Sequence, residues 1–275
     1  MKAYQPKNLR ELEEVLRNSA LNAEILAGGT DFIIAERRSG RQPEELIYVG
    51  GVAEMKEWKA AENGMFIGAC CTMSQIEQSP VLAGPFAAVA EAAADVGSVQ
   101  IRNRGTIGGN IAHASPAADL AAPLMCFDSE AVVLRGGELA RIPVERLITG
   151  SEKTLLKKKD VILGFWLPAC PENTVSHYYK LGSRRQVSIS RFGVAIALRL
   201  EEETAVQARI AIGAIGEKAL RMRGMERALT GRKPDRETGR LLGRMLEEHI
   251  RGTSGRRYKA WASAGVMEDA LAVFR

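Results

Sequence analysis

Two glycine pairs constrain the fold of this chain more than any other feature. They lie at Gly28-Gly29 and at Gly108-Gly109, and each follows an apolar, strand-like run and precedes polar side chains. A glycine pair lets the backbone approach a ligand closely, because no Cβ intervenes and positive φ angles are allowed. Successive N–H groups in such a turn can point into one concavity and hold an anion. Two such loops in one domain predict a pyrophosphate held from both sides, as in a dinucleotide cofactor.

The side chains beside the glycines suit the same ligand. The hydroxyls of Thr30 and Thr106 and the amide of Asn110 could donate to phosphate oxygens alongside the backbone N–H groups. Neither loop has G-x-G-x-x-G or G-x-x-x-x-G-K-[ST] spacing, and the chain has no G-x-S-x-G nucleophile elbow. A glycine pair is usually a tight turn, so the pattern leaves a shared phosphate site and two structural turns equally open.

A further polar segment runs from Ser115 to Asp119. The Asp119 carboxylate could accept hydrogen bonds from sugar-like hydroxyls, or it could cap a helix over residues 120–125. His113 lies just before this segment, and we expect it to pack or to lie at the surface, because the three histidines are scattered and form no ligand pair.

The remaining sequence predicts an α+β protein. Capping patterns at Asn8 and Thr72 predict helices, and further helices are expected over residues 85–95, 236–250 and 258–273. A composition change near residue 170, where long strands are followed by helices, predicts domains over residues 1–170 and 171–275. The strands are expected over residues 23–27, 46–49, 65–69, 99–101, 131–134, 139–142, 161–167, 177–181, 194–200 and 206–215.

Charge restricts the possible partners. The net charge is +5, and residues 217–275 hold 14 Lys and Arg against 8 Asp and Glu. This excess is typical of a solvated helical surface, and an acidic partner protein is the next interpretation. Aromatic residues make up 5% of the chain and do not alternate with basic ones, so nucleic acid is not an expected partner.

Cysteine usage favours a reduced, cytoplasmic setting. The four cysteines form no CxxC pair and no disulfide framework, which argues against a zinc site or an iron–sulfur cluster in this chain. We also expect no membrane contact, because no apolar run reaches the length of a span and the N-terminus lacks an apolar signal core. The cysteines are Cys70, Cys71, Cys126 and Cys170.

Four segments occur together in a characteristic order and spacing. They are Leu26-Ala27-Gly28-Gly29-Thr30-Asp31, Arg102-Asn103-Arg104-Gly105-Thr106-Ile107-Gly108-Gly109-Asn110, Ser115-Pro116-Ala117-Ala118-Asp119, and the stretch from Tyr179 through Arg185 and Gln186 to Ser190. This combination resembles the FAD-binding subunit of the molybdenum hydroxylases, the relatives of xanthine dehydrogenase, carbon monoxide dehydrogenase and aldehyde oxidoreductase. The resemblance covers nearly the whole chain.

The resemblance implies a bilobed FAD-binding domain of the vanillyl-alcohol-oxidase type, followed by a smaller α+β C-terminal domain. It implies noncovalent FAD, with both glycine loops on the pyrophosphate and with Ile162 and Lys180 near the isoalloxazine. A cation at Lys180 would stabilise reduced, anionic flavin, whereas the alternative is a surface lysine at a strand end. The residues that the resemblance assigns to FAD are Leu26, Ala27, Gly28, Gly29, Thr30, Asp31, Phe32, Arg104, Thr106, Gly108, Gly109, Asn110, His113, Asp119, Ile162 and Lys180.

The sequence departs from the family pattern in three places. Val96 occupies a position where some relatives have an aromatic residue against the flavin ring. His113 stands where relatives often have a small or amidic residue, so it either hydrogen-bonds FAD or only packs. The chain also lacks the cysteines that hold an additional cluster in some relatives.

The implied function is that of an electron-transfer subunit. Molybdopterin would be carried by a large partner subunit and two [2Fe–2S] centres by a small one, with FAD on this chain and NAD⁺ or another molecule as the acceptor. No catalytic nucleophile, general base or metal ligand is assigned here, since the isoalloxazine carries out the chemistry. Two other classes remain open: a nucleotide-binding regulatory module without a redox role, and a stand-alone flavin oxidase.

Overall fold

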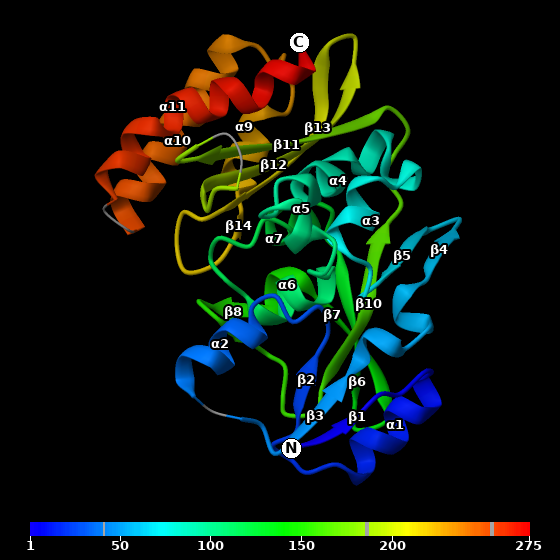
Figure 1. The fold of residues 1–275 in the computed structure, drawn as a ribbon. Helices are drawn as coiled ribbons and strands as arrows, with labels where there is room; N and C mark the ends of the chain where they lie inside the picture. Colours follow the sequence, from blue (N-terminus) through cyan, green and yellow to red (C-terminus); the bar gives the residue numbers. More distant parts are fainter. Residues whose placement is uncertain (41, 185–186, 254–255) are drawn as a thin grey trace.

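The first lobe of the protein is a small parallel sheet with two helices. In the computed structural model, which describes residues 1–40, 42–184, 187–253 and 256–275, strand β3 lies between β1 and β2 (Figure 1). The predicted cap at Asn8 is confirmed, because its side chain accepts a 2.9 Å hydrogen bond from the Glu11 backbone. The elements are β1 (Lys2–Tyr4), α1 (Leu9–Asn18), β2 (Glu24–Leu26), α2 (Phe32–Ser39) and β3 (Glu45–Tyr48).

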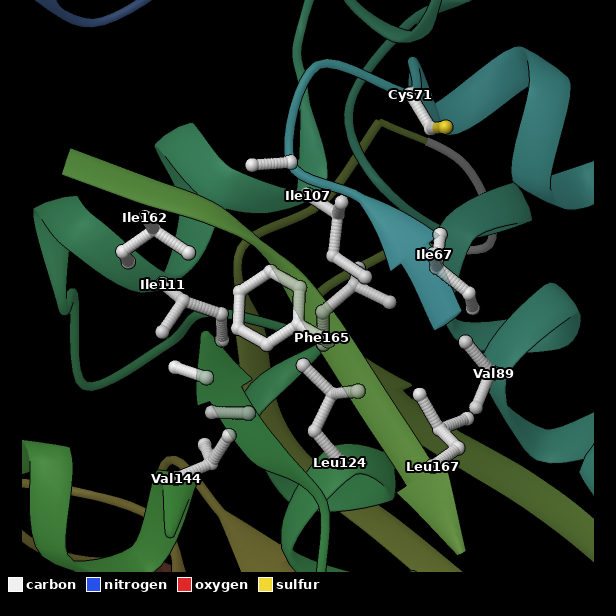
Figure 2. Close-up of a cluster of buried hydrophobic side chains, with 14 of the residues drawn as sticks. Ile67, Cys71, Val89, Ile107, Ile111, Leu124, Val144, Ile162, Phe165 and Leu167 are labelled. Carbon is white, nitrogen blue, oxygen red and sulfur yellow. The ribbon is translucent and has the colours of Figure 1, made fainter. Parts of the chain in front are cut away.

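The second lobe is a five-stranded antiparallel sheet packed against helices. The strand order is β4-β5-β10-β6-β7, and the central strand β10 is buried along most of its length. Figure 2 shows the core around Phe165 of β10, with Ile107 and Ile111 of α6 beside it. The elements are β4 (Trp58–Ala61), β5 (Gly64–Gly68), α3 (Met73–Glu77), α4 (Ala87–Ala94), α5 (Val99–Arg102), α6 (Ile107–His113), α7 (Ala121–Cys126), β6 (Glu130–Arg135), β7 (Glu138–Pro143), α8 (Val144–Leu147), β8 (Ile148–Gly150), β9 (Lys153–Thr154) and β10 (Val161–Pro168).

Most local predictions for this lobe are confirmed, and one is wrong. The capping box of Thr72 and Gln75 begins α3, and the Gly136-Gly137 turn joins β6 to β7. The extended run expected over residues 99–101 is instead the short helix α5. The hydroxyl of Ser98 accepts a hydrogen bond from the Ile101 backbone at 3.4 Å, so a cap starts a helical turn where the apolar residues indicated a strand.

The C-terminal part is an antiparallel sheet covered by helices, as predicted. Figure 1 shows α10 and α11 together over one face of this sheet. None of the helices in the described ranges is long and apolar enough to cross a membrane. The division of the chain at residue 170 stays a prediction. The elements are β11 (Thr174–Gly182), β12 (Ser190–Glu201), β13 (Thr204–Gly213), β14 (Leu220–Arg221), α9 (Arg223–Leu229), α10 (Arg236–Thr253) and α11 (Arg257–Leu271), and short 3-10 turns lie at Val49–Gly51, Glu54–Lys56, Pro80–Leu82, Gly84–Phe86 and Ala272–Phe274.

Strand β12 joins two hydrophobic cores. Its large side chains, such as Phe192 and Ile196, pack with the C-terminal helices. The alternate residues Ala195 and Ala197 belong to the core of the second lobe. Because successive side chains of a strand point to opposite faces, one strand serves both cores. The small alanines leave room for α7 to pack directly on the sheet.

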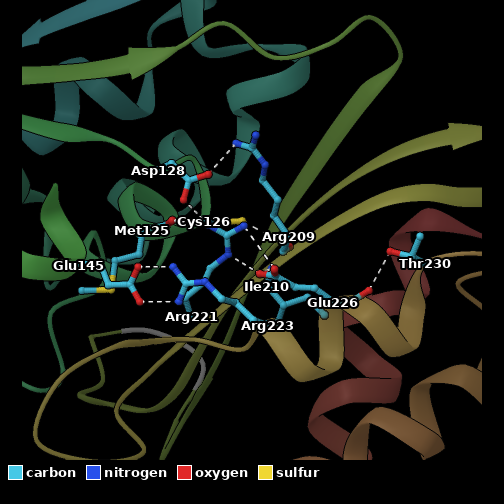
Figure 3. A network of polar contacts seen from close by, with 10 residues as sticks. All are labelled: Met125, Cys126, Asp128, Glu145, Arg209, Ile210, Arg221, Arg223, Glu226 and Thr230. Atoms are coloured by element: carbon cyan, nitrogen blue, oxygen red, sulfur yellow. Dashed lines mark hydrogen bonds and ion pairs between the residues drawn. The ribbon is translucent and has the colours of Figure 1, made fainter.

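An ionic network also crosses between these parts (Figure 3). The Arg221 guanidinium, whose side chain is 7% exposed, binds Glu226 on its own side and Asp128 of the second lobe at 2.5 Å. The exposed Arg223 makes a bidentate pair with Glu145 at 2.7 and 2.6 Å. The two pairs differ in burial, so their energies are expected to differ.

We expect Arg221→Met to lower the free energy of unfolding by about 3 kcal/mol, because it leaves the mostly buried Glu226 carboxylate without its cation. Arg223→Met breaks an exposed pair and should cost less than about 1 kcal/mol. Urea unfolding of both variants measures the difference. Equal losses would contradict the assignment of the buried pair as the stronger link.

Candidate cofactor-binding site

The first glycine loop connects β2 to α2 and touches the second loop. A Cβ added at Gly28 would lie 2.0 Å from the carbonyl oxygen of Arg104, so only glycine allows this approach. Gly29 has φ +76°, in the left-handed region that disfavours other residues. The hydroxyl of Thr30 would lie 3.6 Å from a Cβ at Gly105. The two loops are therefore brought together in space, as the sequence predicted.

The backbone of the first loop presents a row of unused donors. In the described part of the chain, the N–H groups of residues 28–32 have no hydrogen-bond acceptor. They lead into the N-terminus of α2, where the helix dipole adds partial positive charge. Asp31 is the N-cap residue of α2, yet its side chain makes no capping bond there. This arrangement suits an anionic group with several acceptor oxygens.

The second loop uses most of its amides inside the protein. The Ile107 and Gly108 N–H groups bind the carbonyls of Cys71 and Ala69, at 3.1 and 2.9 Å. The Gly109 N–H binds the Thr106 hydroxyl oxygen at 3.1 Å, and the Asn110 N–H binds the Thr106 carbonyl at 3.0 Å. This loop can therefore contact a ligand only through its polar side chains and through the backbone of Gly109, which has no Cβ.

Asn110 supplies the strongest sign of a missing ligand. Its side-chain Oδ1 is buried and has no hydrogen-bond partner in the structure. A buried acceptor without a donor costs roughly 1–3 kcal/mol, so a ligand hydroxyl or amide at this point would be stabilising. Beside it, a Cβ at Gly109 would meet only the Thr106 hydroxyl, at 3.0 Å. These residues fit a polyhydroxylated diphosphate such as FAD.

The other residues predicted for this part of the site fall into three groups. Leu26 ends β2, and Ala27 and Phe32 are half-buried beside the loop. Arg104 and His113 are exposed, and the His113 ring forms no hydrogen bond with the described residues. Ile162 lies in β10, and Figure 2 shows it beside Ile111 of α6, the residue that follows Asn110.

Asp119 is buried and accepts hydrogen bonds from three side chains of the C-terminal sheet. The donors are the hydroxyls of Tyr178 and Ser190, at 2.8 and 2.5 Å, and the ammonium of Lys180 at 2.9 Å. The alternative that Asp119 caps the following helix is wrong. The N-cap residue of α7 is Leu120, and it makes no side-chain capping bond.

Lys180 is held in place from two sides. Besides Asp119, its Nζ binds the Asp95 carbonyl at 2.7 Å, and its side chain is 9% exposed. The alternative of a surface lysine is therefore wrong. Burial, with Asp119 next, raises the pKa of Tyr178 well above 10, so Tyr178 remains a hydrogen-bond donor at physiological pH. Burial likewise raises the pKa of the Asp95 carboxyl, which Lys180 opposes.

Sequence analysis did not single out Tyr178, Ser190 or Asp95 as site residues. A signal for Tyr178 existed, because residues two apart on a strand share one face and Lys180 was already a candidate. Ser190 ends a predicted family segment in which Arg185 and Gln186 lie outside the described residues. Asp95 acts through its backbone carbonyl, which no side-chain pattern reveals.

Comparison with known proteins decides the family. Residues 1–170 match the model of the FAD-binding domain in molybdopterin dehydrogenase. The chain belongs to this family. Residues 177–260 match the C-terminal domain of CO dehydrogenase flavoprotein. The chain is thus an FAD-dependent oxidoreductase subunit of the molybdenum hydroxylase family, with the two-part α+β fold that its sequence predicted.

Its relatives are subunits of dehydrogenases that are named after different substrates. The carbon monoxide dehydrogenase medium chain of Hydrogenophaga pseudoflava is 29% identical over 229 residues, which cover 83% of this chain and 79% of that one. The nicotinate dehydrogenase FAD-subunit of Eubacterium barkeri is 28% identical and covers 86% and 81%. A structure of the Hydrogenophaga pseudoflava carbon monoxide dehydrogenase superposes with a TM-score of 0.88 at 27% identity, covering 98% and 96% of the chains.

We expect Gly28→Ala to separate the two loops, because its Cβ would overlap the Arg104 carbonyl oxygen. The variant should lose bound FAD and about 1–3 kcal/mol of stability. Gly216→Ala is the matched control, since a Cβ there meets nothing within 4 Å. Flavin absorbance per chain and thermal unfolding measure both effects, and full FAD content in Gly28→Ala would contradict the contact.

Proposed function

We propose that this chain is the FAD-carrying electron-transfer subunit of a molybdenum hydroxylase complex. It would connect [2Fe–2S] centres on a small partner subunit, next to a molybdopterin-binding large subunit, to NAD⁺ or another acceptor. The observation that carries the proposal is that two loops in contact at Gly28 and Arg104 hold a free amide row, at residues 28–32, and the unpartnered buried oxygen of Asn110. FAD supplies one- and two-electron transfer when it is bound.

Different parts of the site would bind different parts of the cofactor. The amides of residues 28–32 and the start of α2 would bind the diphosphate, because both present positive charge. The exposed guanidinium of Arg104 adds a cation at the edge. Thr106 and Asn110 would exchange hydrogen bonds with hydroxyl and phosphate oxygens. The bare face of Gly109 leaves space for these contacts.

Lys180 would tune the flavin. Two of its three N–H groups bind Asp119 and the Asp95 carbonyl, which leaves one donor for a ligand. A cation near the N1/O2 edge of the flavin stabilises the reduced, anionic form. Asp119 fixes this cation in position, so its principal role is to orient Lys180.

Heteromeric assembly is supported by the names of the relatives. They include a medium chain, an FAD-subunit and a complex subunit alpha. A stand-alone flavin oxidase would instead turn over a substrate as a single purified chain. A regulatory nucleotide-binding module would bind ADP or a dinucleotide and stay colourless. Flavin absorbance and single-chain turnover distinguish the three functions.

We expect the purified chain to be yellow and to bleach on reduction, and Gly109→Val to abolish FAD retention. A Cβ there meets only the Thr106 hydroxyl, at 3.0 Å, so a valine needs a small local shift within the fold and fills the surface left for the ligand. Gly224→Val in α9 is the control, because its Cβ meets only the Met245 methyl at 3.9 Å. If Gly109→Val kept normal flavin stoichiometry, the second loop would not contact the cofactor.

We expect Lys180→Met to lower the flavin midpoint potential by on the order of 30 mV, equivalent to about 1.4 kcal/mol for a two-electron couple. The loss of the cation destabilises the reduced form, whereas Lys180→Arg retains the charge and should shift the potential much less. Potentiometric titration at constant pH measures both. An unchanged potential in Lys180→Met would remove Lys180 from the flavin environment.

A further inference from the structure

The start of α11 and the start of β12 carry unusually exposed apolar side chains. Ile189 is 81% exposed, Trp261 77% and Tyr258 46%. Together with the exposed Arg191, Arg256 and Arg257 we name these residues the arginine–aromatic patch. Large exposed apolar side chains that gather with arginine are typical of protein interfaces.

The patch is pre-organised. The Arg191 guanidinium lies 4.9 Å from the centre of the Tyr258 ring, and the Tyr258 and Trp261 rings are 6.3 Å apart. Lys259 lies between Tyr258 and Trp261 in the sequence. Its side chain points into the protein, where Nζ donates to the Ala214 carbonyl. Burial, with Arg256 and Arg191 next, lowers the pKa of Lys259 to about 8. A surface fixed in this way loses little conformational entropy on binding.

The patch also has an uncompensated positive charge. Residues 181–200 and 249–267 contain no Asp or Glu. Among the described residues, Arg191, Arg256 and Arg257 form no ion pair. On the neighbouring helix α10, by contrast, Arg236 pairs with Glu268 and Arg251 with Glu247. An acidic partner surface would supply the missing carboxylates.

The patch lies directly outside the proposed cofactor site. Ser190 stands between Ile189 and Arg191, and its hydroxyl donates to the buried Asp119. Asp119 in turn holds Lys180. A protein bound at the patch would therefore lie close to the cation assigned to the flavin.

We propose that the arginine–aromatic patch is the docking surface for the [2Fe–2S] partner subunit. On that subunit, an apolar hollow would receive Trp261, and acidic residues around the hollow would face the arginines. This inference rests on the proposed function, because it requires a redox partner. Trp, Tyr and Arg are the residue types that dominate binding at protein interfaces. Carboxylates on the partner would pair with Arg191, Arg256 and Arg257.

The test is coexpression of the tagged full-length chain with its large and [2Fe–2S] subunits, followed by affinity purification at low and high salt. Trp261→Ala, and separately Arg191→Glu with Arg256→Glu, should each lower the affinity for the [2Fe–2S] subunit about 30-fold, as expected of central interface residues. Wild-type binding should also weaken as salt increases. The controls are Leu139→Ala and Arg227→Glu, which alter an exposed leucine and an exposed arginine outside the patch.

Flavin content, dithionite bleaching and thermal unfolding separate docking from the cofactor site. The proposal expects the patch variants to match wild type in all three while the [2Fe–2S] subunit is lost. Full retention of that subunit, loss of only the large subunit, or loss of FAD from the patch variants would each overturn it. A colourless wild-type chain that still binds the [2Fe–2S] subunit through the patch would refute the proposed function and leave the docking surface in place.

Discussion

A buried carboxylate helps to hold the second lobe and the C-terminal sheet of this molecule together. Asp119 comes from the second lobe, and its three donors, Tyr178, Lys180 and Ser190, come from the C-terminal sheet. Burial of a charge is costly unless the charge is paired and hydrogen-bonded, and this carboxylate meets both conditions. The C-terminal sheet therefore packs where it delivers these donors, and Lys180 is held at the boundary as a consequence.

Close backbone contact plays the corresponding role within the first two lobes. Gly28 approaches the Arg104 carbonyl, and Gly108 approaches Ala69, where an added Cβ would lie 2.6 Å from the alanine side chain. The two glycine loops nevertheless contribute differently. The first offers free amides, whereas the second uses its amides to bind the segment after β5 and leaves side chains for the ligand. The two loops would therefore contribute unequally to the proposed pyrophosphate site.

Features decided by local chemistry were mostly predictable from the sequence, whereas the partners of Asp119, which depend on distant contacts, were not. The Thr72 capping box and the Gly136-Gly137 hairpin depend on residues a few positions apart, and both form. The Ser98 cap is equally local but was hidden by an apolar run typical of a strand. Asp119 was recognised as a candidate, yet its partners lie 59 to 71 positions away, so its cap and ligand interpretations could not be separated from the sequence.

A β-bulge at the start of β12 places the proposed cofactor site next to the proposed partner surface, because Leu181 pairs with Phe192 and Gly182 with Ser190, which leaves Arg191 as the extra residue. Ser190 begins β12 with its side chain directed to the buried Asp119, while its neighbours Ile189 and Arg191 are exposed. Further along, Phe192 and Ala195 divide between the two cores. The bulge turns Ser190 to the face that Ala195 shares and leaves Arg191 outside the regular pairing, so a surface for a partner can form immediately outside a buried site. In the proposed complex, such an arrangement would bring an electron donor near the flavin.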